Sequence, residues 1–103
     1  MLNGWKEKMT IHDIQIIVSR LAREYGAERV YLFGSYARGE ATDQSDIDLR
    51  IDKGDIRGLR FAGLLGDLEE ALGKKVDLIS TGGMDENFLR AIRPDEVLLY
   101  ERY

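Results

Sequence analysis

A short glycine-serine turn followed by two aspartates is the part of this sequence that could carry out chemistry. The string GSYARGEATDQSDIDL begins at Gly34, and ten residues separate Ser35 from Asp46. A strand that ends in glycine and leads into a helix exposes unpaired backbone N–H groups, which bind phosphate oxygens readily. The Ser35 hydroxyl adds a donor, and Arg38 on the same helical face could reach a phosphate oxygen. Taken alone, the pattern also fits an ordinary strand-to-helix turn with a surface arginine.

Asp46 and Asp48 form a pair of carboxylates two residues apart on a predicted strand. Alternate residues of a strand project from the same face, so the two negative charges repel unless a cation lies between them. Mg²⁺ prefers oxygen ligands and often takes one or two carboxylates together with substrate phosphates. The pair therefore indicates a magnesium site, although the solvated face of an edge strand would contain the same residues.

Asp77 is a third carboxylate, and it interrupts an otherwise apolar predicted strand. A charged residue between buried neighbours needs a partner, unless it lies at an exposed strand end. If its strand lies beside the one that carries Asp48, then Asp46, Asp48 and Asp77 converge and could hold two metal ions about 4 Å apart. One ion would organise a triphosphate and its leaving pyrophosphate, and the other would activate an acceptor hydroxyl. Asp77 would accept the proton of that hydroxyl.

Alternating helix and strand patterns predict the frame that positions these residues. A capping box at Thr10 and Asp13 begins an amphipathic helix of about four turns, which ends at Gly26. The other predicted elements are strands at 30–33, 47–51, 75–79 and 97–100, a helical turn at 35–39, a helix at 57–72 and a short helix capped by Asp85. The 57–72 helix is expected to present Leu59, Ala62, Leu65, Leu68 and Leu72 as its apolar face.

This order predicts an α/β (α+β) fold, a small mixed sheet of about four strands with helices packed on it. The 103 residues suffice for one compact domain, which we expect to span 1–103. The chain has no cysteine, which excludes disulfides and thiolate metal sites and fits a cytoplasmic protein. No apolar run approaches the roughly 20 residues that span a bilayer, and the first residues do not resemble a secretory signal. The net charge of −4 argues against direct nucleic-acid binding but not against nucleotide binding.

The residues quoted above resemble the signature of the DNA-polymerase-β-like nucleotidyltransferase superfamily. The fuller string from Gly34 to Leu49 is similar to the minimal nucleotidyltransferase branch, typified by MntA-type antitoxins. The resemblance implies that Gly34 and Ser35 hold the phosphates of ATP, and that Asp46, Asp48 and Asp77 bind Mg²⁺. It also implies a HEPN-domain RNase toxin as partner, which would be silenced by transfer of AMP from ATP to one of its tyrosines.

Two other functions remain open from the sequence. The protein could be a catalytically silent antitoxin that acts by binding alone, because its acidic charge would suit the basic face of an RNase. Three repelling carboxylates speak against that function, since a scaffold does not need them. Transfer to a small molecule such as an aminoglycoside would need an acceptor pocket, which we expect a partner or a second copy to complete in a homo- or hetero-oligomer.

Arg50 departs from the family pattern, in which an apolar residue is more usual at this position. It lies on the same strand face as Asp46 and Asp48. The sequence leaves open whether it pairs with a carboxylate, with a phosphate or with an acidic partner surface.

Overall fold

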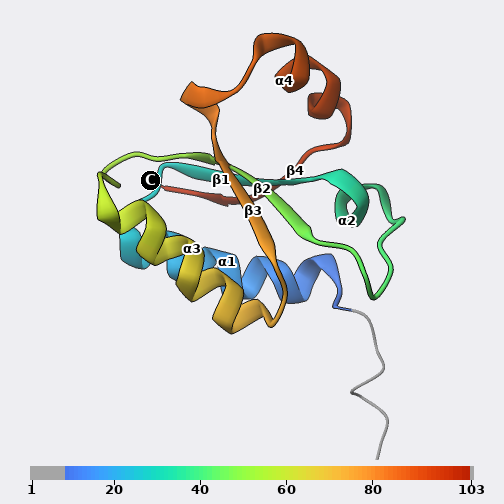
Figure 1. Cartoon of the computed structure of the whole chain (residues 1–103), viewed down its shortest axis with the longest axis horizontal. Coiled ribbons are helices and arrows are strands. Elements are labelled where there is room, and N and C mark those ends of the chain that lie inside the picture. The colour runs from blue at the N-terminus through green and yellow to red at the C-terminus, as the bar shows by residue number, and fades with distance from the viewer. Residues whose placement is uncertain (1–8, 103) are drawn as a thin grey trace, which may run out of the picture.

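A four-stranded mixed sheet forms the centre of the protein, with the strand order β3-β2-β1-β4 (Figure 1). Strand β1 (Arg29–Phe33) pairs antiparallel with both β2 (Ile47–Asp52) and β4 (Val97–Glu101). Strand β3 (Val76–Ser80) pairs parallel with β2. The predicted small mixed sheet is therefore confirmed.

The computed structural model describes residues 9–102. Residues 1–8 and Tyr103, which the predicted domain includes, lie outside the described part. No helix within 9–102 combines the length and the apolar character that crossing a membrane would require.

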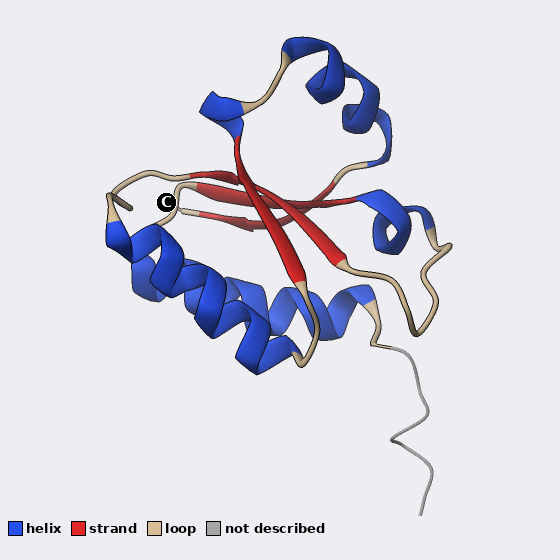
Figure 2. Ribbon diagram, in the orientation of Figure 1, coloured by secondary structure: helices blue, strands red, loops and turns tan. Residues whose placement is uncertain are grey.

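The helices divide between the two faces of the sheet. Helices α1 (Ile11–Tyr25) and α3 (Leu59–Leu72) lie along one face, whereas α4 (Glu86–Ile92) lies on the opposite side (Figure 2). The short helix α2 (Gly34–Arg38) continues directly from the end of β1. Helix α3 connects the parallel strands β2 and β3, which cannot be joined by a tight turn.

The alternation in β2 separates a core face from a polar face. Ile47, Leu49 and Ile51 are fully buried, and they belong to the hydrophobic core that α1 and α3 complete. Asp48 and Arg50 occupy the alternate positions and therefore project toward the side of α4. The side of the sheet that carries the acidic residues is thus the side that α1 and α3 leave uncovered.

Helix α1 forms as predicted. Thr10 and Asp13 make a reciprocal capping box, and Gly26 ends the helix in the left-handed conformation with φ of 87°. The predicted apolar face of helix α3 is confirmed in its second half, where Leu68 and Leu72 are buried. In the first half it is wrong, because Leu59 is 90% exposed, Ala62 is exposed and Leu64 is buried instead.

Strand β4 is irregular where it meets β1. Its register shifts between Val30 and Tyr31 of β1, which is the mark of a β-bulge. The backbone carbonyl of Leu99 accepts hydrogen bonds from Nε2 of Gln15 at 3.2 Å and from Oγ of Ser19 at 3.1 Å. Two side chains of α1 thus hold this edge strand in place.

Candidate active site

The turn between β1 and α2 lies directly against a carboxylate of β2. Gly34 has φ of 76°, a left-handed conformation that strongly favours glycine. A Cβ atom at this position would lie 2.1 Å from Oδ2 of Asp48 and 3.0 Å from its Cγ. Backbone conformation and available space therefore both require glycine here. The predicted phosphate turn and the predicted acid belong to one site.

The sheet register brings Asp48 and Asp77 side by side. Asp48 on β2 is the register partner of Asp77 on β3 and of Phe33 on β1. Paired residues of neighbouring strands project from the same face, so both carboxyl groups lie on the side of the sheet opposite α1 and α3. The prediction that the strand with Asp77 lies next to the strand with Asp48 is confirmed.

The proximity of these carboxyl groups changes the acidity of Asp48. Burial, a hydrogen bond with Asp77 and the negative charges of Asp77 and Asp46, in that order of importance, together raise the pKa of Asp48 from 3.8 to about 6. The positive charge of Arg38 acts in the opposite direction. Near neutral pH the folded protein therefore holds two carboxyl groups close together at an energetic cost.

Asp46 stands apart from this pair. It precedes β2, its side chain is 42% exposed, and its Oδ2 lies 3.9 Å from Nζ of Lys75. Within residues 9–102, no group of three or more His, Cys, Asp or Glu side chains is arranged to hold a metal ion. The structure thus brings Asp48 and Asp77 together and leaves Asp46 at the edge of the site.

The donor chemistry of the pair fits Mg²⁺. Carboxylate oxygens are the ligands that Mg²⁺ takes in proteins, usually one or two of them, with substrate phosphates filling other positions. Burial first, and then the neighbouring carboxyl groups, raise the pKa of Asp48, and a bound cation would favour its ionised form.

Arg38, predicted to contact phosphate, is the last residue of α2 and is exposed. Its Nε donates to Oε1 of Glu40 at 3.0 Å. This exposed ion pair is weak, so the guanidinium can exchange Glu40 for another anion.

Arg50 is buried, and its partner is a carboxylate of this chain. Its Nε and Nη2 donate to the two carboxylate oxygens of Glu96 at 2.5 and 2.8 Å. The guanidinium also lies over the ring of Tyr31, 4.0 Å from the centroid. Of the three alternatives left open by the sequence, the structure selects a carboxylate.

The contact between Phe33 and Phe88 was not expected from the sequence. Phe33 is the last residue of β1, and its ring meets the ring of Phe88 on α4 edge to face, with centroids 5.9 Å apart. Sequence periodicity placed Phe88 on a short apolar helix, but it carries no signal of the strand that this helix contacts. Helix α4 thus lies beside the residue that leads into the Gly34 turn.

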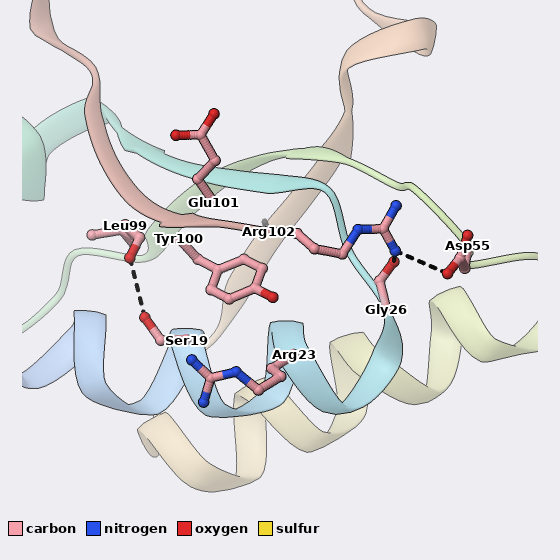
Figure 3. A pocket seen from close by; sticks show the side chains of 8 residues that line it. All are labelled: Ser19, Arg23, Gly26, Asp55, Leu99, Tyr100, Glu101 and Arg102. Atoms are coloured by element: carbon pink, nitrogen blue, oxygen red, sulfur yellow. Dashed lines mark hydrogen bonds and ion pairs between the residues drawn. The ribbon is translucent and has the colours of Figure 1, made fainter.

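A hollow of about 570 Å³ lies far from these residues, between the C-terminal end of α1 and the end of β4 (Figure 3). Arg102, one of its lining residues, donates to the carbonyl of Gly26 at 3.3 Å and to Oδ2 of Asp55 at 2.9 Å. It also donates to Glu28 at 2.9 Å. These bonds tie the C-terminal end of the chain to the α1–β1 and β2–α3 connections, which is a structural role.

Comparison with known proteins gives a consistent result. The family described as polymerase beta, nucleotidyltransferase matches residues 15–103. The protein adenylyltransferase MntA of Thermococcus cleftensis is 32% identical over 89 residues, which cover 82% of this chain and 90% of that protein. A solved structure assigned as a minimal nucleotidyltransferase is similar with a TM-score of 0.77 and 33% identity, covering 91% of this chain and 98% of that chain. A toxin-antitoxin structure with AMP-PNP has a TM-score of 0.70 and 26% identity, covering 85% of this chain and 72% of that chain.

Proposed function

Because this chain belongs to the minimal branch of the polymerase beta nucleotidyltransferase family, we propose that it is an antitoxin that transfers AMP from ATP to a tyrosine of a HEPN-type RNase toxin. The observation that carries the proposal is the placement of Asp48 against both Asp77 and Gly34. The likeness to a protein adenylyltransferase and to a toxin-antitoxin structure with AMP-PNP supports the reaction and the kind of partner.

In this proposal the turn holds the nucleotide and the carboxylates face its phosphates. The backbone N–H groups at Gly34 and the hydroxyl of Ser35 bind phosphate oxygens, and Arg38 leaves Glu40 to neutralise them. Asp48 and Asp77 are the carboxylates that would hold Mg²⁺, with Asp46 turning from Lys75 to join them. When bound, the metal, which we expect as two ions, neutralises the negative charge of the triphosphate.

The transfer itself is a displacement at phosphorus. The tyrosine hydroxyl oxygen attacks the α-phosphorus of ATP, and a new oxygen–phosphorus bond forms. The bond from that phosphorus to the oxygen that bridges to the β-phosphate breaks, and pyrophosphate leaves with the bonding electrons. The carboxylate of Asp77, which lies beside Asp48 in the sheet, accepts the hydroxyl proton.

The proposed assembly consists of one domain spanning residues 1–103, its nucleotide and a toxin that supplies the acceptor. The net charge of −4 favours a partner with a basic face over direct binding to nucleic acid. We expect the acceptor side of the site to be formed between chains.

Label transfer tests the proposal. The protein is mixed with the product of the neighbouring reading frame, with Mg²⁺ and with ATP labelled at the α- or the γ-phosphate. We expect the α-label alone to reach the partner, and Asp48→Asn and Asp77→Asn to abolish transfer. Glu70→Gln, which removes an exposed carboxylate on α3, is the matched control and should leave transfer unchanged.

Two results would decide against the proposal. Absence of label on the partner with the wild-type protein would refute transfer. If Asp48→Asn and Asp77→Asn neutralise the toxin as well as wild type does, the protein acts by binding alone.

A further inference from the structure

A buried guanidinium joins the two ends of the segment between β3 and β4, on the side of the sheet that carries Asp48. We propose that Arg50 is a positioning residue for the nucleotide: it closes the base of residues 81–96 and thereby keeps Phe88 against Phe33, next to the Gly34 turn. The part of this inference that concerns ATP rests on the proposed function, whereas the part that concerns the segment does not.

Arg50 contacts both ends of the segment at once. Its Nη1 donates to Oγ1 of Thr81 at 3.0 Å, at the point where β3 ends, and Thr81 itself donates to the carbonyl of Ile51 at 3.3 Å. Its Nε and Nη2 bind the carboxylate of Glu96, the residue that precedes β4. One side chain of β2 thus joins two positions that are adjacent in space and fifteen residues apart in sequence.

The buried setting makes these contacts strong. The side chain of Arg50 is 5% exposed and that of Glu96 is 6% exposed. The bond with Glu96 raises the pKa of Arg50, so the guanidinium stays charged. A bidentate arginine–carboxylate pair fixes the direction as well as the distance between its partners. Loss of one partner would leave the other charge buried without compensation.

The segment has few other means of attachment. The elements between the two ends are a 3-10 turn (Thr81–Gly83), α4 and a second 3-10 turn (Arg93–Asp95), and none of the three contains a buried residue. Elements with little buried apolar surface open at low energetic cost. Besides the contact of Phe88 with Phe33, the position of α4 over the sheet is therefore expected to depend on the clasp, by which we mean the bonds of Arg50 with Thr81 and Glu96.

The clasp affects the nucleotide through Phe88. This ring lies edge to face on Phe33, and Phe33 is the residue whose peptide leads into Gly34. If the base opens, Phe88 leaves Phe33, and the turn that binds phosphate loses a packing neighbour. Arg50 thus acts on the site through two aromatic rings, without touching ATP.

The test uses a variant that keeps the fold. Arg50→Met combined with Glu96→Leu replaces the buried ion pair by apolar side chains, a change that other proteins tolerate without loss of stability. Phe88→Ala removes the aromatic contact and leaves the clasp intact. The ATP dissociation constant, with Mg²⁺ present, is measured by calorimetry for wild type, for each of these variants and for their combination. Hydrogen exchange of the α4 amides is followed in parallel.

We expect the Met/Leu variant and Phe88→Ala each to weaken ATP binding at least fivefold, and the combination to weaken it no further than either alone, because both act through one contact. We also expect the α4 amides to exchange at least fivefold faster in the Met/Leu variant than in wild type, whereas the exchange of the α1 amides should not change. The single variant Arg50→Lys keeps the charge, so its α4 amides should be better protected from exchange than those of the Met/Leu variant. If the wild-type protein does not bind ATP, the result counts against the proposed function. The hydrogen-exchange measurement then still tests whether Arg50 holds the segment in place.

Unchanged exchange in the Met/Leu variant would overturn the clasp. Two outcomes would overturn the link from Arg50 to the nucleotide. One is faster exchange in a Met/Leu variant that binds ATP as tightly as wild type does. The other is that the losses of ATP affinity in the Met/Leu variant and in Phe88→Ala multiply when the two are combined.

Discussion

Asp48→Asn should stabilise the protein while it abolishes catalysis. In the folded protein the pKa of Asp48 is about 6 instead of 3.8, so the ionised carboxylate destabilises the fold above pH 6. Each pKa unit corresponds to about 1.4 kcal/mol, which gives an upper bound of about 3 kcal/mol. Solvent screening at this half-buried position reduces the effect, and we expect a gain of about 1–2 kcal/mol for asparagine.

The pH dependence gives the sign of the effect. The stability associated with a protonated Asp48 is fully present below pH 3.8 and is lost as the pH rises through 6. The difference between Asp48→Asn and wild type should therefore be largest at pH 7.5 and should vanish near pH 3.5.

Urea denaturation followed by circular dichroism, without divalent metal, measures the free energy of unfolding at both pH values. Glu70→Gln should stay within about 0.5 kcal/mol of wild type at either pH. Asp48→Asn that is no more stable than wild type at pH 7.5 would show that the carboxyl pair does not strain the fold.

Three further predictions concern the turn, the metal and the core. Gly34→Ala should lower the free energy of unfolding, measured by urea denaturation, by at least about 2 kcal/mol, and it should abolish transfer. Gly39 has a similar φ but no neighbour within 4 Å, so Gly39→Ala should lower the free energy of unfolding by only about 1 kcal/mol. Mg²⁺ should raise the melting temperature of wild type at pH 7.5 more than that of Asp48→Asn, and equal shifts would exclude this pair as ligands. Leu64→Ala should cost about 2–5 kcal/mol and Leu59→Ala less than about 0.5 kcal/mol; comparable losses would contradict the burial of these side chains.

The elements and the central pair of the site could be predicted from local patterns. A capping box marks the start of α1, and alternation in β2 identifies the face of Asp48. The adjacency of Asp77 was a hypothesis, because a helix between two strands permits several strand orders and only the parallel β2–β3 pairing selects this one. In α3 the sequence correctly predicts that Leu68 and Leu72 are buried, but not that Leu64 is buried and Leu59 exposed, because several leucines fit a helical apolar stripe and tertiary packing decides between them.

Long-range partners were beyond the reach of the sequence. Arg50 binds Glu96, which lies 46 positions away, and several other carboxylates of the chain would have satisfied the same guanidinium. Asp46 pairs with Lys75 through strand adjacency rather than sequence spacing. Charge alone specifies that a partner exists, whereas the sheet register specifies which residue it is.

The irregularity in β4 also bears on how the folded chain behaves among many copies of itself. An open strand edge is a template onto which a foreign strand can add, and proteins avoid this by bending or occupying the edge. Here the bulge bends the edge, and Gln15 and Ser19 already occupy the carbonyl of Leu99. We therefore expect the β4 edge to be a poorer template for strand addition than a regular edge strand would be.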